Sequence, residues 1–545
     1  MINLICRLVV VLSLFLTCVS TAPGLTNPFN TEVNEMEDEY RMHPVLNFKR
    51  SSSSNQRLQK RAMPKLSFRS PNPDEEESEY WRDTAQDILR NQLNKNQLNM
   101  NVAKNVIMFL GDGMSIPTVT AARVYMGGEE QQLSFEKFPY IGLSKTYCAN
   151  TQVADSACTA TAYLGGVKAN YGTIGVSAAV DLNNCRAQNN TEHHVPSIAE
   201  WAQSRGLATG LITTTSVTHA SPAGVYAHTA NRNWENDGEI LKDGEDPEQC
   251  LDIAQQLIYG TVGRNLNVIM GGGREQFLPK GQKDILGGKG KRHDNQNLID
   301  KWKSIHNGAS AFVQTKEELS ATPKDVEFMM GLFATSHIPF HVDADNETIP
   351  SLAEMVDKAI DVLEAQNRGY FLFVEGGRID HAHHDTEAVR ALDETIEFHK
   401  AIDLARKRTS ESDTLIVVTS DHSHTMSVAG YSSRKNDIFG ISNGQLGTDE
   451  IPYATLSYAN GPGFESHMAE GRRRNLLQTN MRDKNFRFPA TVPLDSETHG
   501  GDDVGVFASG PQAHLFTGVY EQHYIPHAMA YVACLGEKMT ACTKT

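Results

Sequence analysis

Three apolar runs in this chain end on residue types that commonly bind metal ions. Residues 106–110 lead into Asp112, residues 371–374 lead into Glu375 and the motif Asp380-His381-Ala382-His383-His384, and residues 415–418 lead into Asp421-His422-Ser423-His424. Short apolar runs rich in β-branched residues predict buried strands of a parallel sheet. In open α/β sheets, ligands bind beyond the carboxyl ends of the strands. These strand ends therefore predict one shared site for polyvalent metal ions.

Asp155-Ser156 introduces a predicted helix that continues through Ala160 and Tyr163. A serine at a helix N-terminus is often only a cap, which contributes ~1 kcal/mol. The helix dipole and a nearby cation would also stabilise Ser156 as an alkoxide, and the position therefore suits a nucleophile that attacks phosphorus. The dipeptide alone does not decide between these two roles.

The other candidate ligands are weak signals when each is taken alone. Asp112 lies between two glycines, where it either forms an Asx turn or bridges two cations. Asp380 and His384 have the i, i+4 spacing of one helical face, but His-rich surface helices also occur without metal. His499 is a single histidine in a predicted loop and gains significance only from the other candidates.

The elements that must position these residues alternate between strand and helix from residue 105 onward. Further strand-like runs cover residues 208–213, 268–270 and 504–508, and residues 350–365 form a predicted amphipathic helix. This alternation predicts an α/β fold with a mostly parallel central sheet flanked by helices. Between about residues 427 and 493 the pattern loosens into Gly, Asn, Arg and Ser, which predicts a surface insertion.

Composition limits the classes of partner. The chain has 545 residues, 39% of them apolar, and a formal net charge of −16. Such an acidic chain is a poor partner for a nucleic-acid backbone, so we expect no nucleic acid to bind.

The N-terminus predicts secretion. Arg7 precedes the apolar run of residues 8–16, and small residues follow up to Ala22, which indicates a signal peptide over residues 1–22. A retained signal anchor is the alternative. Residues 23–84 are predicted to be a flexible segment, and its pairs Lys49-Arg50 and Lys60-Arg61 belong either to a pro-region or to a plain tail. Asn189 and Asn346 begin glycosylation motifs.

On the strength of these residues and the motifs around them, the chain resembles the animal alkaline phosphatases over residues 85–545. The matching motifs are Asp112-Gly113-Met114 and residues 153–163, 219–232, 371–384, 419–424 and 497–503. Separated matches in the same order leave little room for chance. The resemblance implies that family's fold, with a crown-like surface insertion, and hydrolysis of small phosphate monoesters at alkaline pH through a phosphoserine intermediate. It also implies a homodimer.

The resemblance implies a role for each matching residue. Ser156 corresponds to the nucleophile and Arg232 to the guanidinium that binds phosphate. The implied metal ligands are Asp380, His384 and His499 for a first zinc ion, Asp112, Asp421 and His422 for a second, and Asp112, Ser221 and Glu375 for one magnesium ion. The histidines implied beside these ligands are His219, His381 and His424. Imidazole and carboxylate ligands suit zinc, and an all-oxygen set suits magnesium.

The six cysteines beyond the signal peptide form an even set, as expected in an oxidising compartment. The resemblance implies the pairs Cys185–Cys250 and Cys534–Cys542. Cys148 and Cys158 flank the predicted nucleophile, and either a third bridge or two free thiols remains open.

Two features depart from the family pattern. Phe333-Ala334 and Ile349-Pro350 stand where many vertebrate members have acidic calcium ligands, so we expect no calcium there. The chain also stops at Thr545 without the apolar tail that precedes a glycolipid anchor. We therefore expect a secreted, soluble protein without a transmembrane anchor, or an isoform of an anchored one.

The sequence also bears on three alternatives to a phosphomonoesterase. A sulfatase would need a C-x-P-x-R motif, which Cys158-Thr159-Ala160 does not supply. A phosphodiesterase of the same superfamily typically has a threonine nucleophile. A secreted glycoprotein that acts mainly as a protein-binding surface is the alternative outside the enzymes.

Overall fold

The computed structural model describes Asp74, Ser78–Lys95 and residues 98–308, 310–536 and 540–542. The predicted signal peptide, residues 1–22, and most of the predicted flexible segment, residues 23–84, lie outside the described residues. Helix α3 (Ser78–Lys95) begins before residue 85. Within the described ranges, no helix has both the length and the apolar character needed to cross a lipid bilayer.

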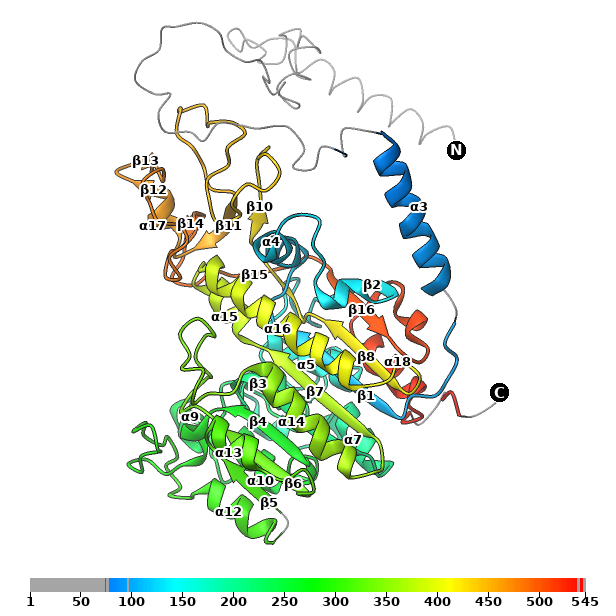
Figure 1. The fold of residues 1–545 in the computed structure, drawn as a ribbon. Coiled ribbons are helices and arrows are strands. Elements are labelled where there is room, and N and C mark those ends of the chain that lie inside the picture. Colours follow the sequence, from blue (N-terminus) through cyan, green and yellow to red (C-terminus); the bar gives the residue numbers. More distant parts are fainter. Residues whose placement is uncertain (1–73, 75–77, 96–97, 309, 537–539, 543–545) are drawn as a thin grey trace, which may run out of the picture. The chain divides into compact units, whose positions relative to one another are not determined.

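A large sheet occupies the centre of the described chain (Figure 1). Its strand order is β17-β2-β16-β8-β1-β7-β3-β4-β6-β5. The strands are β1 (Asn105–Gly111), β2 (Tyr140–Lys145), β3 (Ala208–Ser216), β4 (Val268–Gly272), β5 (Ser310–Val313), β6 (Phe328–Leu332), β7 (Tyr370–Gly376), β8 (Thr414–Thr419), β16 (Val504–Ser509) and β17 (Gly518–Glu521). Strand β16 runs antiparallel to β2 and β8, and the other neighbours are parallel. The predicted mostly parallel α/β sheet is therefore confirmed.

Helices cover both faces of this sheet. The helices are α4 (Ile116–Met126), α5 (Ser156–Gly165), α6 (Cys185–Gln188), α7 (Ile198–Ser204), α8 (Ala220–Ala223), α9 (Asp237–Lys242), α10 (Ile253–Tyr259), α11 (Arg274–Phe277), α12 (Leu298–Ile305), α13 (Lys316–Ala321), α14 (Leu352–Ala365), α15 (Arg378–His384), α16 (Ala388–Arg408), α17 (Phe464–His467) and α18 (Tyr524–Val532). Buried side chains of α4, α14 and α16 belong to one core cluster with Ile107 and Phe109 of β1, whereas those of α5, α7, α10, α12 and α18 belong to another with Val106 and Met108. Alternate residues of β1 therefore enter opposite layers of the core.

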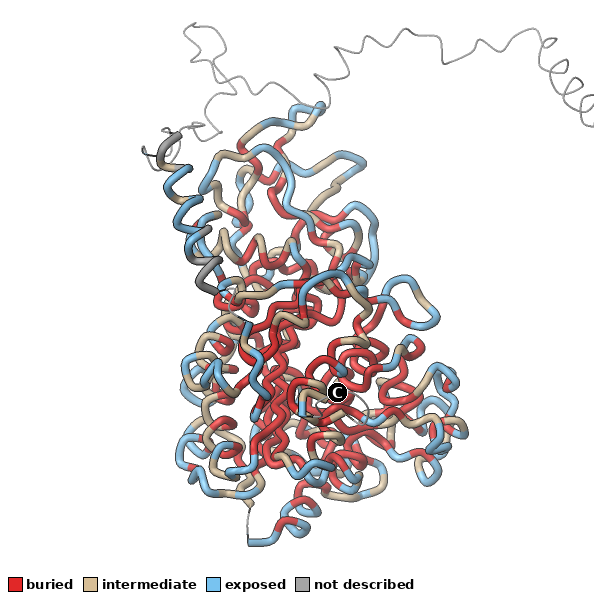
Figure 2. Tube along the Cα trace, turned by 90° about the vertical axis from the view of Figure 1, so that its right-hand side faces the viewer, coloured by how far each residue is buried: buried red, intermediate tan, exposed pale blue. Residues whose placement is uncertain are grey.

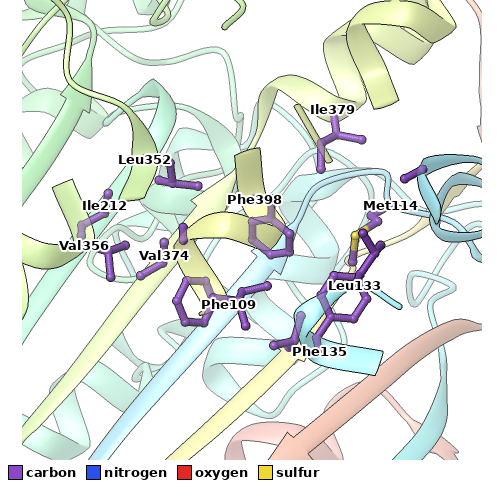
Figure 3. Close-up of a cluster of buried hydrophobic side chains, with 14 of the residues drawn as sticks. Phe109, Met114, Leu133, Phe135, Ile212, Leu352, Val356, Val374, Ile379 and Phe398 are labelled. Atoms are coloured by element: carbon purple, nitrogen blue, oxygen red, sulfur yellow. The ribbon is translucent and has the colours of Figure 1, made fainter. Parts of the chain in front are cut away.

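The buried core explains why the central strands are apolar on both sides. Every residue of β1, β7 and β8 is buried, and Figure 2 shows buried residues running through the middle of the fold. Figure 3 shows Phe109 of β1 beside Phe398 of α16, and their ring centroids lie 5.9 Å apart in an edge-to-face contact. Strands enclosed by helices on two faces cannot alternate apolar with polar residues, and this accounts for the unbroken apolar runs in the sequence.

Helix α14 illustrates how local sequence sets an element boundary. Ser351 accepts a hydrogen bond from the backbone N–H of Glu354, and the Glu354 side chain returns to the N–H of Ser351, which completes a capping box. The predicted helix over residues 350–365 therefore begins at Leu352. Its buried residues Met355 and Ile360 contribute to the core beneath the sheet.

The predicted surface insertion contains a small sheet of its own. Strands β10 (Ser427–Val428), β11 (Leu456–Gly461) and β14 (Ala490–Pro493) pair side by side, and β12 (Met468–Ala469) pairs with β13 (Arg472–Arg473). Phe439, Tyr458 and Phe488 from this region are buried in the same core cluster as α14 and α16. The insertion therefore shares the core of the main fold.

The register of the parallel strands brings the candidate residues to one edge. Leu110 pairs with Glu375 of β7 and with Thr419 of β8, and Thr213 of β3 also pairs with Glu375. The carboxyl ends of β8, β1, β7 and β3 are therefore neighbours, and the residues that follow each of them share one site.

Candidate metal centre and nucleophile

Ser156 is the first residue of α5, and Asp155 rather than Ser156 caps that helix. The Asp155 carboxylate accepts a hydrogen bond from the backbone N–H of Cys158 at 3.2 Å. The Ser156 hydroxyl lies instead 3.2 Å from Nε2 of His422 and 3.4 Å from Oδ1 of Asp112. The capping role is therefore taken by a neighbour, and the Ser156 oxygen faces two of the predicted metal ligands at the positive end of the helix.

Asp155 also holds the candidate phosphate-binding residue. Nη1 of Arg232 donates to Oδ2 of Asp155 at 3.0 Å, and the N–H of Gly172 donates to Oδ1 at 3.1 Å. The guanidinium of Arg232 is thereby fixed next to the N-terminus of α5. Sequence reasoning missed this role of Asp155, although the preference for Asp at an N-cap was an available signal.

Four carboxylates lie buried at the strand ends: Asp112, Glu375, Asp380 and Asp421. Burial, together with the charges of Asp421, Asp380 and Glu375, raises the pKa of Asp112 well above its usual value. Burial likewise raises the pKa of Glu375 to about 7. Despite burial, nearby histidines lower the pKa of Asp380 and of Asp421. Asp112 and Glu375 keep raised pKa values, and a cation would stabilise both of them as anions.

One part of the site is built from oxygen atoms alone. The Ser221 hydroxyl donates to Oδ2 of Asp112 at 3.2 Å. Glu375 accepts hydrogen bonds from Thr213 and from Thr215, both on β3. Its other oxygen, Oε1, is buried and receives no hydrogen bond within the described chain. An unsatisfied carboxylate oxygen beside a hydroxyl and a second carboxylate fits a hard cation such as magnesium.

A second part of the site is built from histidines on α15 and on β15 (His499–Gly500). Nδ1 of His384 donates to the backbone oxygen of Glu497 at 2.5 Å, and Nδ1 of His499 donates to that of Ala154 at 2.7 Å. Since carbonyl oxygens only accept, each neutral imidazole carries its proton on Nδ1 and a lone pair on Nε2. The two Nε2 atoms face each other at 3.1 Å. Facing lone pairs repel unless a cation lies between them, so this pair fits a zinc site.

His422 has the same arrangement on the other side of Asp380. Nδ1 of His422 lies 3.3 Å from the backbone oxygen of Ser423, and its Nε2 lies 3.0 Å from Oδ2 of Asp421. That Asp421 oxygen is buried without a hydrogen bond from any described residue. Ligand atoms of Asp112, Asp380 and His422 lie within 4.8 Å of one another, and so do those of Asp380, His384, His424 and His499. Asp380 therefore joins two adjacent candidate cation sites.

His424 lies between two carboxylates, and its environment differs from that of the other histidines. Its Nδ1 donates to Glu497, and its Nε2 lies 2.7 Å from Oδ1 of Asp380. Burial alone would lower the pKa of His424, but Glu497 and Asp380 raise it to about 10. Each ring nitrogen of His424 therefore faces a carboxylate, and the place beside the ligand set that the resemblance implies for it stays a prediction.

His219 and His381 lie together on the Arg232 side of the site, with His337 as a third partner. The ring centroids of His219 and His381 are 5.2 Å apart, and those of His337 and His381 are 4.6 Å apart. Nη2 of Arg232 lies 3.4 Å from Nε2 of His219. His337 follows β6 in a loop, and the sequence carries no local signal that identifies it.

The described residues form three disulfides. Cys185 pairs with Cys250, Cys534 pairs with Cys542, and Cys148 pairs with Cys158. The open question about Cys148 and Cys158 is thereby answered. Asp155 and Ser156 lie between these two cysteines, so the bridge ties the nucleophile segment to the preceding loop.

Replacing both Cys148 and Cys158 with alanine should lower the free energy of unfolding by about 3 kcal/mol, since the bridge closes a short loop. It should also lower kcat, because Asp155 and Ser156 lose their anchor. Urea unfolding and steady-state kinetics measure the two effects. Replacing Cys534 and Cys542, a pair with no predicted site residue between them, is the control, and we expect it to lower stability without changing kcat. An unchanged unfolding midpoint in the first variant would contradict the prediction.

The remaining predicted positions are on the surface or in the core. Asn189 and Asn346 are exposed. Phe333 and Ala334 are buried at the end of β6, where they offer no carboxylate. The absence of calcium at this position stays a prediction.

Comparisons with known proteins find similar sequences that cover most of the chain. A family model described as alkaline phosphatase matches residues 103–535. The membrane-bound alkaline phosphatase of Bombyx mori is 47% identical over 483 residues, which cover 86% of this chain and 87% of that protein. The tissue-nonspecific alkaline phosphatase of Homo sapiens is 46% identical over 482 residues, or 86% of this chain and 91% of that protein.

Solved structures show the same fold at lower sequence identity. An alkaline phosphatase from the Antarctic bacterium TAB5 has a TM-score of 0.56 at 23% identity and covers 80% of this chain and 100% of that chain. The alkaline phosphatase of Thermus thermophilus has a TM-score of 0.58 at 21% identity and covers 83% of this chain and 96% of that chain.

Proposed function

Because this chain belongs to the alkaline phosphatase family, and is therefore an enzyme that hydrolyses phosphate monoesters, we propose that Ser156 is its nucleophile and Arg232 its phosphate-binding residue. One observation carries the proposal. The Ser156 hydroxyl stands at the N-terminus of α5, free of any capping role, and faces His422 and Asp112.

The proposed cofactors are two zinc ions and one magnesium ion. Asp380, His384 and His499 would hold the first zinc, Asp112, Asp421 and His422 the second, and Asp112, Ser221 and Glu375 the magnesium. Facing Nε2 lone pairs and unsatisfied carboxylate oxygens support these ligand sets. When bound, the ions would supply the positive charge that stabilises an ionised Ser156 oxygen and the phosphoryl group.

In the proposed mechanism Ser156, Arg232 and Asp155 act in two successive displacements at phosphorus. Ser156 Oγ gives its proton to solvent and attacks phosphorus as the bond to the alcohol oxygen breaks. The departing oxygen takes up a proton from solvent, which leaves a phosphoserine and a free alcohol. A water molecule then attacks phosphorus and the bond to Ser156 Oγ breaks, so that one water proton returns to Ser156 Oγ and hydrogen phosphate is released. Arg232 presents two parallel N–H donors to the non-bridging oxygens throughout. Asp155 keeps the guanidinium in that orientation.

Turnover of p-nitrophenyl phosphate and of bis(p-nitrophenyl) phosphate tests this proposal against its alternatives. We expect the monoester to be hydrolysed far faster than the diester, and a sample quenched in acid during turnover of a radiolabelled monoester to carry label on Ser156. A faster diester reaction would favour the phosphodiesterase. No turnover of either substrate by the zinc-loaded chain would favour the protein-binding surface.

Replacing Arg232 with alanine should raise both KM and the inhibition constant of inorganic phosphate by about 10- to 100-fold, since a charged hydrogen-bond pair to the phosphoryl group is lost. Zinc content should stay that of the parent, because Arg232 is not a proposed ligand. Arg232→Lys should recover only part of the affinity, since an ammonium group cannot present the planar pair of donors. Competition kinetics measure the effect, and unchanged phosphate inhibition would argue against the assignment.

We further propose that the chain is secreted as a glycosylated homodimer that acts on small phosphomonoesters. The exposed sequons at Asn189 and Asn346, the three disulfides and the predicted signal peptide support secretion. The Bombyx mori relative is named membrane-bound, so attachment has to be measured. Cell fractionation, enzymatic removal of glycans and light scattering of the purified protein test these points separately.

A further inference from the structure

Glu497 precedes β15 by two residues and takes no part in the proposed bond changes. Its side chain is buried, with 1% of its surface exposed. It lies between the end of the surface insertion and His499. A carboxylate in this position is either an internal structural anchor or a residue that orients the metal ligands.

The carboxylate of Glu497 faces the loop that follows β8. Oε2 accepts a hydrogen bond from Nδ1 of His424. Oε1 accepts from the backbone N–H of Thr425 at 2.7 Å and from the Thr425 hydroxyl. Both carboxylate oxygens are therefore used, and His424 is held with its Nε2 toward Asp380.

The backbone of Glu497 fixes a second imidazole. Its N–H donates to the backbone oxygen of His384 at 2.8 Å, and its own backbone oxygen accepts from Nδ1 of His384 at 2.5 Å. His384 is therefore held in the tautomer that leaves Nε2 free for a cation. Glu497 thus contacts α15 through its main chain and the His424 loop through its side chain.

Close packing leaves Glu497 little freedom to move. A Cβ atom on Gly461 of β11 would lie 2.8 Å from Cβ of Glu497 and 2.9 Å from Cγ2 of Thr386. A side chain at position 461 would push Glu497 away from the histidines, so glycine is needed there. The Thr425 hydroxyl also accepts from the N–H of Ala459 in β11 at 3.2 Å. The insertion therefore supports the same network.

We propose that Glu497 is a positioning residue of the metal centre: its carboxylate orients His424, and its backbone orients His384, so that both imidazoles direct Nε2 toward Asp380. This inference rests on the proposed zinc site. If Glu497 were only a structural anchor, there would be no reason for its contacts to hold two histidines, His424 and His384, that both face the Asp380 carboxylate. Groups that orient metal ligands in this way typically change metal affinity or activity by about 10- to 100-fold when they are removed.

The test is Glu497→Gln in the full, zinc-loaded chain. The amide keeps the volume and the backbone contacts, but it cannot accept hydrogen bonds from both His424 and Thr425 with two equivalent oxygens. We expect zinc to transfer to a chromophoric chelator about 10- to 100-fold faster than from the parent. The visible absorption of the cobalt-substituted chain should also shift, which a remote change in stability would not cause.

Glu394→Gln is the matched control. Glu394 is also buried and accepts a backbone N–H, that of His341 at 2.7 Å, but it lies outside the candidate site. This variant should release zinc at the parent rate. If Glu497→Gln fails to fold, Thr425→Val decides, because it removes a hydroxyl that holds the same carboxylate and should speed zinc release in the same direction. Parent-like zinc release and cobalt absorption in the folded variant would overturn the inference, whereas a parent chain that binds no zinc would overturn the proposed function itself.

Discussion

Ser156→Ala should lower kcat for p-nitrophenyl phosphate by about 10⁴- to 10⁶-fold, the loss typical of removing a catalytic nucleophile. In the proposed mechanism this hydroxyl attacks phosphorus, and it lies 3.2 Å from His422 and 3.4 Å from Asp112. Alanine is a good helix former, and Asp155 continues to cap α5, so the fold should persist. The remaining activity would come from water that attacks the bound ester directly.

Three measurements separate loss of the nucleophile from loss of the site. Elemental analysis should find the parent's metal content in Ser156→Ala, and the variant should carry no label after an acid quench. Thr159→Ala is a control in the same helix, since it removes a hydroxyl that donates to the backbone oxygen of Asp155 at 3.0 Å. Its kcat should stay close to that of the parent. If Ser156→Ala retained near-normal turnover with full metal content, another residue would have to be the nucleophile.

The part of this site that the sequence predicts well is the part that follows the sheet. Asp112, Glu375 and Asp421 lie at or just beyond the ends of apolar runs, and the runs are long because β1, β7 and β8 are enclosed by helices on both faces. Parallel pairing then brings these three residues together without any further information. Asp380 and His384 were also predictable as a pair, since both lie on α15 at helical spacing.

Residues that reach the site from distant loops were predictable only by resemblance. His499 is close to His384 because β15 pairs with β9 (Ser423–His424), and strands of two residues leave no periodic pattern in a sequence. Arg232 has its place through a hydrogen bond to Asp155, across a long separation in the chain. The tautomers of His384 and His499 depend on which carbonyl oxygen lies beside Nδ1, and this is fixed only after folding.

The structure also shows why the candidate site depends on positive charge. Asp112, Glu375, Asp380 and Asp421 are buried together, and burial raises the pKa of both Asp112 and Glu375. The hydrogen-bond donors of the described residues leave Oε1 of Glu375 and Oδ2 of Asp421 unsatisfied. Histidines lower the pKa of Asp380 and Asp421 despite burial, but without cations Asp112 and Glu375 must take up protons or repel their neighbours, and either outcome alters the surroundings of Ser156.

Removing the metal ions with a chelator should therefore lower kcat at least about 10³-fold, because each 1.4 kcal/mol of lost transition-state stabilisation costs a factor of ten and metal ions contribute several kcal/mol. The melting temperature should fall as well, since ions that bind the folded chain stabilise it by mass action. Zinc and magnesium together should restore turnover. Magnesium alone should not, because the facing Nε2 atoms of His384 and His499 suit zinc, whereas magnesium prefers oxygen ligands.

Adding zinc and magnesium back separately to the chelated protein distinguishes the two kinds of site. Zinc should restore most of the activity to the parent, but not to His499→Ala, which lacks one of the two facing imidazoles and should hold less zinc at equilibrium. Glu375→Gln should respond in the opposite way, with normal zinc content and a weakened response to magnesium, because Glu375 belongs to the all-oxygen group. Metal titrations followed by activity and elemental analysis distinguish the two variants. Full activity of the chelated parent would show that the buried carboxylates and histidines serve the fold alone.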